Sequence, residues 1–214
     1  MTKIKICGVT LTDDAARVAA LGVDYIGFNF WPRSKRYLSP DRAPLLAAVA
    51  RSSGPVRIVG LFVDAEPQEI VDICAKVQLD VLQLHGDETP EEVGKIGAAT
   101  KQPIWKALAV ASARDLDRLE AWPCDAILLD APSPQRGGAG KPFDWALAAA
   151  ARRKHPARKL VIAGGLDASS VGAAIAQLSP FAVDVASGVE AAPGVKDPAK
   201  LEAFVAAVRA TSPA

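Results

Sequence analysis

The chain has 214 residues, half of them hydrophobic and 23% charged, with a formal net charge of +1 at pH 7. This composition is typical of a globular protein and offers no basic stripe for nucleic acid. No apolar run approaches the roughly 20 residues that cross a bilayer, and the N-terminus lacks the features of a secretory signal, so we expect no membrane partner. The three widely spaced cysteines form no CxxC pair, which predicts free thiols, a cytoplasmic location and no metal site.

Short apolar runs alternate with Ala/Leu-rich segments of helical pattern along the chain. The short runs are rich in β-branched and aromatic residues and have strand length. The predicted strands are KIKIC (3–7), YIGFNF (25–30), VRIVGLFV (56–63), VLQLH (81–85), PIWKALAV (103–110), AILLD (126–130), LVIAG (160–164) and AVDVAS (182–187). The predicted helices are 12–22, 39–50, 66–77, 89–97, 112–121, 144–153, 169–178 and 197–210.

Eight strands that alternate with eight helices indicate a parallel sheet with helical crossovers. Eight such units predict an α/β fold, a single-domain (β/α)8 TIM barrel over residues 1–214, with about 27 residues per unit. The alternative is a doubly wound open sheet, but no GxGxxG motif follows the first strand, so dinucleotide binding has little support. In a barrel the active groups lie where strands end, so polar residues late in the strands are the candidates.

The alternation of strand side chains predicts which of these residues face the barrel interior. Ile4 and Ile6 should meet the helices, so Lys5 and Cys7 should point inward, with Cys7 nearer the mouth. The same reasoning points further polar residues inward from later strands, namely Gln83, His85, Lys106, Asp130 and Asp184. Acids, bases and a thiol would then converge on one axis.

Each of these residues also has a structural interpretation. Cys7 can be a small buried hydrophobe, and Asp130 can cap a loop. Lys5 and Asp184 can form an interior ion pair, and His85 can support a loop instead of contacting substrate. Outside this group, Cys74 shares a helix face with apolar residues and is expected in the core, His155 is expected at the surface, and Cys124 has no expected role.

Two glycine-containing loops indicate a phosphate site. IAGGLD (162–167) contains Gly164 and Gly165, and ASGVEAAPG (186–194) contains Ser187 and Gly188. Glycines let backbone N–H groups approach an anion, and the loops after strands seven and eight often bind phosphate in barrels. Two ordinary tight turns are the alternative. In addition, the glycine-rich segment 133–145 could close over a ligand, and an arginine in 31–40 could bind a substrate carboxylate as a fork.

Taken together, the motifs resemble those of the phosphoribosylanthranilate isomerase family of tryptophan biosynthesis. The matching strings are KICGVT, GFNFWPRSKRYLSP, VGLFVD, VQLDVLQLHGDE, ILLD, GGAGKPFDW, AGGLD and PFAVDVASGVEAAPGVKD, in family order between residues 5 and 197. Two departures are minor: GLDASSV lacks the Asn-Pro often seen after the Gly-Gly-Leu, and Ala186 stands where Ser is common.

The resemblance implies an Amadori rearrangement of N-(5′-phosphoribosyl)anthranilate to 1-(o-carboxyphenylamino)-1-deoxyribulose 5-phosphate, without a metal or organic cofactor. It implies Cys7 as general base, Asp130 as general acid and Arg36 as the contact for the anthranilate carboxylate. His85 and Asp184 are placed in the substrate site, and the two glycine loops hold the phosphate. Because a cysteine base must be partly ionised, we expect a neighbour to favour the thiolate, and Lys5 is the candidate.

Two other functions remain open on the sequence. A related phosphosugar barrel such as indole-glycerol-phosphate synthase would need a lysine acid, for which Lys106 is available, and a nearby glutamate. A non-catalytic binder of phosphoribosyl ligands is the other possibility. We expect the small-molecule substrate as the partner and a monomer as the oligomeric state, with a dimer as the alternative.

Overall fold

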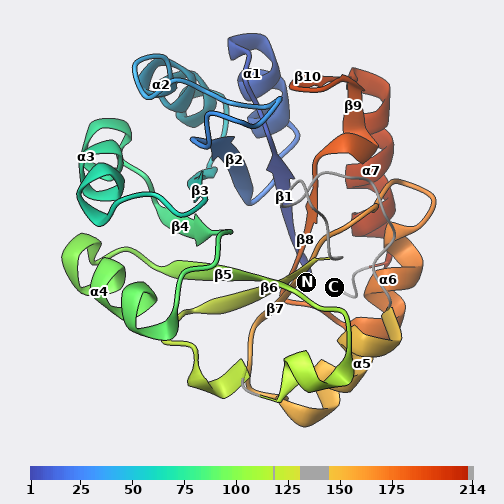
Figure 1. Ribbon diagram of the computed structural model, residues 1–214. Coiled ribbons are helices and arrows are strands. Elements are labelled where there is room, and N and C mark those ends of the chain that lie inside the picture. The colour runs from blue at the N-terminus through green and yellow to red at the C-terminus, as the bar shows by residue number, and fades with distance from the viewer. Residues whose placement is uncertain (118, 131–144, 212–214) are drawn as a thin grey trace.

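The computed structural model describes residues 1–117, 119–130 and 145–211, and its centre is a closed barrel of eight parallel strands (Figure 1). β1 (Lys3–Cys7) pairs with β2 (Tyr25–Asn29) on one side and with β8 (Ala182–Val185) on the other, which closes the sheet. The strands between them are β3 (Arg57–Phe62), β4 (Val81–Leu84), β5 (Ile104–Ala109), β6 (Ala126–Asp130) and β7 (Leu160–Ile162). The predicted single-domain (β/α)8 barrel is confirmed, and the open sheet is excluded.

Helices surround the barrel and cover its outer face (Figure 1). They are α1 (Thr12–Ala20), α2 (Ala43–Ser53), α3 (Pro67–Val77), α4 (Pro90–Thr100), α5 (Trp145–Lys154), α6 (Val171–Leu178) and α7 (Pro198–Thr211). Among the described residues, no helix is long and apolar enough to cross a membrane. α2 begins later than predicted because Ser39 starts a turn, in which its hydroxyl accepts a hydrogen bond from the N–H of Asp41 and its carbonyl accepts one from Arg42.

The helix predicted over 112–121 is wrong. Two short 3₁₀ helices, η1 (Ala113–Leu116) and η2 (Leu119–Ala121), connect β5 to β6 instead. The carbonyls that a continuing helix would use are taken by side chains: His155 Nε2 lies 2.7 Å from the Leu116 oxygen, and Arg158 donates to the Leu119 oxygen. His155 is therefore buried, not at the surface as predicted, and it stabilises this crossover.

A two-stranded antiparallel hairpin that the sequence did not predict follows β8. Its strands are β9 (Glu190–Ala192) and β10 (Val195–Lys196), which follow η3 (Ser187–Val189) and lie next to α1 and α7 (Figure 1). In the hairpin register Lys196 lies opposite Glu190, with a bulge next to it.

The inward and outward phases agree with the prediction. Ile4 and Ile6 belong to the large apolar layer between barrel and helices, together with the predicted core residue Cys74. Tyr25 and Trp105 pack edge to face inside the barrel, with ring centroids 4.8 Å apart. Further polar side chains that point inward are almost completely buried, namely Lys5, Gln83 and Lys106.

Three aspartates connect neighbouring strands at the N-terminal end of the barrel. Each directly precedes an even-numbered strand and accepts a hydrogen bond from a main-chain N–H at the start of the preceding strand. The pairs are Asp24 with Ile4 at 2.9 Å, Asp80 with Ile58 at 2.7 Å and Asp125 with Ile104 at 2.8 Å. A carboxylate thus satisfies a backbone donor that the parallel ladder leaves open at its end.

We expect Asp80→Ala to lower the free energy of unfolding by about 1–3 kcal/mol, because it leaves the Ile58 N–H without its carboxylate. Urea unfolding followed by circular dichroism measures this change. The control is Asp72→Ala on the exposed face of α3, which removes a carboxylate that bonds only the Gln68 side chain in the described structure. Equal stability of the two variants would contradict this role of Asp80.

Candidate active site

The predicted thiol lies at the C-terminal end of β1, in the mouth of the barrel. Cys7 is 7% exposed and packs with Leu61 and Val63, against which Trp31 also packs. Gly27 on β2 leaves room for the sulfur, because a Cβ at that position would lie only 3.0 Å from Sγ. The absence of a side chain at Gly27 thus shapes the pocket of the thiol.

Three charged groups act on Cys7. Burial raises the pKa of the thiol and outweighs the opposite effect of Lys5 and Lys196, while Asp184 raises it further. Lys5 therefore acts in the predicted direction, but the net shift is opposite to the one expected for an activated cysteine.

The predicted interior ion pair between Lys5 and Asp184 is present in the structure. The Lys5 ammonium lies 2.8 Å from Asp184 Oδ1, and the two residues are register partners across the β1–β8 seam. Burial would lower the pKa of Lys5, but the charges and hydrogen bonds of Asp184 and Cys7 together outweigh burial, and the pKa lies above its ordinary value. Lys5 is therefore charged next to Cys7. A substrate contact of Asp184 stays a prediction.

The predicted acid lies at the mouth as the last residue of β6, and a histidine that directly follows β4 faces it. His85 Nε2 lies 3.6 Å from Asp130 Oδ2. On the other side of the ring, Gln83 Nε2 lies 3.1 Å from His85 Nδ1. With the amide nitrogen as donor, Nδ1 accepts, and the tautomer that fits this contact carries its proton on Nε2, the ring nitrogen nearer Asp130.

The buried Lys106 ammonium forms an ion pair and a hydrogen bond with the segment that follows β4. The ammonium lies 2.8 Å from Glu88 Oε2 and 2.7 Å from the carbonyl oxygen of Gly86, and only 2% of the Lys106 side chain is exposed. Glu88 in turn accepts hydrogen bonds from the N–H groups of Asp64 and Gly86. This buried pair holds the loops after β3 and β4 together.

Arg36 comes from the loop after β2 and lies over the end of β1. A Cβ on Gly8 would be 2.4 Å from Arg36 Cδ, and Gly8 has a φ of +73°, so both crowding and backbone favour glycine there. The guanidinium donates to Glu190 from Nε at 2.8 Å and from Nη2 at 2.6 Å. The sequence pattern did not indicate this acidic partner, although Glu190 stands in the predicted phosphate loop ASGVEAAPG (186–194).

The two predicted phosphate loops lie against each other at the mouth. Gly164 and Gly165 both have positive φ, at 84° and 68°. Gly188 in η3 has no space for a side chain, since its Cβ would lie 2.0 Å from the Leu166 oxygen. Ser187 and Gly165 are exposed and the other two glycines partly so. Both loops are therefore partly exposed to solvent in one region.

Two further predictions concern the glycine-rich segment after β6 and the absence of a metal site. The glycine-rich segment 133–145 falls outside the described residues except for its last residue, Trp145. Within the described ranges there is no group of three or more His, Cys, Asp or Glu side chains that could hold a metal ion.

The mouth of the barrel thus holds a buried thiol, a carboxylate, an arginine fixed by an ion pair and two partly exposed glycine loops. This is the organisation of a (β/α)8-barrel enzyme that moves protons on an anionic small molecule.

Comparison with known proteins identifies the family. The family model for N-(5′-phosphoribosyl)anthranilate (PRA) isomerase matches residues 4–207. The N-(5′-phosphoribosyl)anthranilate isomerase of Ralstonia nicotianae is 44% identical over 97% of this chain and 93% of its own. The chain belongs to the N-(5′-phosphoribosyl)anthranilate isomerase family and is an isomerase, which confirms the predicted family and activity and sets aside indole-glycerol-phosphate synthase.

Solved structures agree. Monomers generated from the dimeric phosphoribosylanthranilate isomerase of Thermotoga maritima are 40% identical, with a TM-score of 0.86 over 98% of this chain and 100% of theirs. A phosphoribosylanthranilate isomerase in complex with reduced 1-(o-carboxyphenylamino)-1-deoxyribulose 5-phosphate is 39% identical, with a TM-score of 0.85 and the same coverage.

The environment of Cys7 predicts the pH dependence of its alkylation. Because the pKa of the thiol is raised, its reaction rate with iodoacetamide should still increase above about pH 8.5 instead of levelling off near neutrality. Lys5→Met should move the midpoint of the rate against pH curve to higher pH, and Asp184→Asn should move it to lower pH. The reason is that the positive charge of Lys5 favours the thiolate, whereas the negative charge of Asp184 disfavours it. Mass spectrometry of the Cys7 peptide separates it from the other cysteines.

An unchanged midpoint in Lys5→Met would show that Lys5 does not favour the thiolate. A plateau of the wild-type rate below pH 7 would contradict the dominant effect of burial.

Proposed function

We propose that the chain converts N-(5′-phosphoribosyl)anthranilate into 1-(o-carboxyphenylamino)-1-deoxyribulose 5-phosphate, with Cys7 as general base and Asp130 as general acid. The observation that carries this assignment is the position of the two residues. Cys7 is the last residue of β1 and Asp130 is the last residue of β6, and both strands end at the same mouth of the barrel. Catalytic groups in barrels occupy these positions.

The first step needs an acid. A proton delivered by Asp130 to the furanose oxygen lets the C1′–O bond break while the anilino nitrogen forms a Schiff base with C1′. His85 supports this role, because its Nε2 lies 3.6 Å from the Asp130 carboxylate and can stabilise the negative charge that remains after the proton has left.

The second step needs a base. The Schiff base makes the C2′ hydrogen acidic, and the Cys7 thiolate removes it to give an enolamine. The enolamine then tautomerises to the ketone as C1′ gains a proton and the C2′ hydroxyl loses its own, which restores the proton that the acid gave to the furanose oxygen. The charges of Lys5 and Lys196 stabilise the thiolate in an otherwise apolar pocket. Atoms balance without a cofactor, since the reaction only relocates protons within the substrate.

The substrate groups that do not react need anchors. Arg36 presents unused guanidinium donors for the anthranilate carboxylate, and the N–H groups around Gly164, Gly165, Ser187 and Gly188 suit the phosphate. We assign His85 and Asp184 to the part of the mouth nearest the ribose, between these two anchors.

Cys7→Ala and Asp130→Asn should each lower kcat by about a hundredfold or more, as expected for a positioned base and acid. Loss of anthranilate fluorescence of the substrate on mixing with pure protein measures the reaction. The matched control is Cys74→Ala, which removes a buried thiol from α3 outside the mouth. Wild-type turnover in either mouth variant would remove that residue from its role.

Arg36→Met should mainly raise KM, because a carboxylate contact made equally in ground and transition states contributes to binding and not to the chemical step. Steady-state kinetics with the same fluorescence assay give both constants. An unchanged KM would remove Arg36 from the substrate site.

We also propose a monomer in the cytoplasm. A monomer is compatible with a proposed site whose residues all lie at the mouth of a single barrel. The dimeric Thermotoga maritima relative makes a dimer the alternative, which sedimentation velocity distinguishes. Support for the location is that the three cysteines, Cys7, Cys74 and Cys124, are all free thiols.

A further inference from the structure

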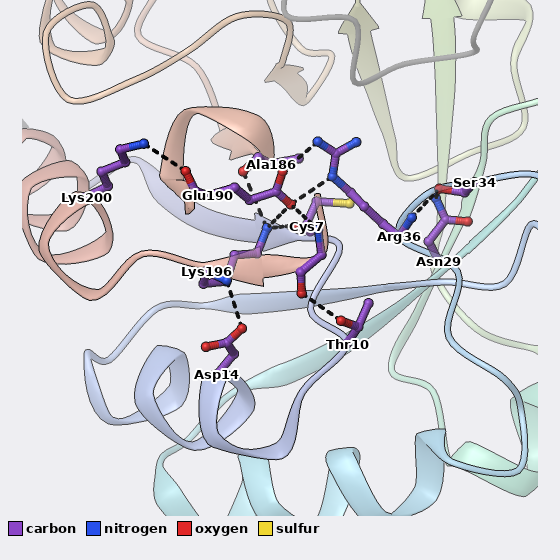
Figure 2. A network of polar contacts seen from close by, with 11 residues as sticks. Cys7, Thr10, Asp14, Asn29, Ser34, Arg36, Ala186, Glu190, Lys196 and Lys200 are labelled. Carbon is purple, nitrogen blue, oxygen red and sulfur yellow. Dashed lines mark hydrogen bonds and ion pairs between the residues drawn. The ribbon is translucent and has the colours of Figure 1, made fainter. Parts of the chain in front are cut away.

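The β9–β10 hairpin places a buried charge pair next to the catalytic mouth. Glu190 and Lys196 are register partners, with side chains only 5% and 0% exposed. Lys196 Nζ lies 2.9 Å from Glu190 Oε1. Figure 2 shows Lys196 and Arg36 converging on the Glu190 carboxylate, with Cys7 beside them. Buried charges are costly unless they are paired, so this arrangement calls for an explanation.

The hairpin is attached to the end of β1 by several polar contacts. The Lys196 ammonium donates to the carbonyl oxygen of Cys7 at 2.5 Å, and its main-chain N–H donates to Asp14 on α1 at 2.8 Å. The Thr10 hydroxyl donates to the Gly194 carbonyl at 2.6 Å (Figure 2). Glu190 therefore has a fixed position relative to Cys7.

Glu190 is ionised in this setting. Burial would raise the pKa of its carboxyl group, but hydrogen bonds and charge from Arg36 and Lys196 outweigh burial, and the pKa lies below its usual range. The carboxylate also accepts the Gly194 N–H. It is thus a rigid anion that faces the guanidinium.

Two of the five guanidinium N–H groups of Arg36 point to Glu190, which leaves three, two on Nη1 and one on Nη2. These three form the edge that a second carboxylate can bind as a fork.

The backbone of Arg36 is held as well. Its N–H donates to the Ser34 hydroxyl, which accepts a second hydrogen bond from Asn29 Nδ2 (Figure 2). Both ends of the Arg36 side chain are therefore fixed, the main chain by Ser34 and the guanidinium by Glu190.

We propose that Glu190 is a positioning residue, which fixes the Arg36 guanidinium over the end of β1 so that its free edge receives the carboxylate on the aromatic ring of the substrate. This inference rests on the proposed contact of Arg36 with that carboxylate. It assigns to the hairpin the task of selecting substrates whose ring carries an ortho-carboxylate.

The test compares two probes by isothermal titration calorimetry. One is reduced 1-(o-carboxyphenylamino)-1-deoxyribulose 5-phosphate, and the other is the same molecule with an unsubstituted phenyl ring. Glu190→Gln should weaken binding of the first probe by about tenfold and leave the second within about twofold, because only the first uses the fixed guanidinium edge. KM for the substrate should rise by a similar factor, with a smaller change in kcat.

Lys200→Met is the matched control. Lys200 donates to the main-chain oxygen of Glu190 at 2.8 Å and is exposed, so this variant perturbs the same hairpin without removing the carboxylate. Both probes should bind it as they bind the wild type. If Glu190→Gln fails to fold, Glu190→Gln/Lys196→Met removes one charge of each sign and leaves no buried ammonium without its carboxylate. The double variant should show the same selective loss.

Equal weakening of both probes, or unchanged or tighter binding of the carboxylate probe, would overturn the positioning role of Glu190. If wild-type protein itself does not prefer the carboxylate probe, the contact of Arg36 with the carboxylate is wrong, and the role of Glu190 falls with it. A wild-type preference that survives in Glu190→Gln overturns only the role of Glu190.

Discussion

Pairing of the first strand with the last is the constraint on which the mouth of this barrel depends. The β1–β8 seam places Lys5 opposite Asp184 in register and brings Cys7 next to the segment that follows β8. That segment then supplies η3, the β9–β10 hairpin and the ammonium of Lys196, which returns to the Cys7 carbonyl. Residues almost the whole chain apart thus form one site, because only a closed sheet makes the two terminal strands neighbours.

The buried lysines of the barrel and of the β9–β10 hairpin have carboxylate partners. Three lysines are almost completely buried, and each has a carboxylate within hydrogen-bond distance: Lys5 with Asp184, Lys106 with Glu88 and Lys196 with Glu190. Such pairs contribute little net stability, since desolvation offsets their attraction, but removal of one partner leaves an unpaired buried charge. What these pairs determine is where the charged groups lie relative to Cys7. Two of the pairs flank Cys7, and they set the balance between burial, which favours the thiol, and positive charge, which favours the thiolate.

Errors of the sequence interpretation share a cause. The segment 112–121 has a helical pattern, but the carbonyls of Leu116 and Leu119 bond His155 and Arg158 from a distant part of the chain. His155 has charged neighbours in sequence and was expected at the surface, yet it is buried by that contact. Arg36 was correctly singled out as a basic residue near the mouth, while its partner Glu190 was missed. In each case a side chain distant in sequence decides the outcome, and local pattern carries no information about it.

Alternation of short apolar runs with helical segments determined the number of strands, their order and the phase of each one, because side chains alternate strictly along a strand. This is sufficient to place Cys7, His85, Asp130 and Asp184 at one mouth. Only the tertiary structure decided which of those groups face one another, which lysine bonds which carboxylate, and that burial outweighs charge at Cys7. The reason is that ion pairing and desolvation depend on distances between residues far apart in sequence, which exist only once the barrel has closed.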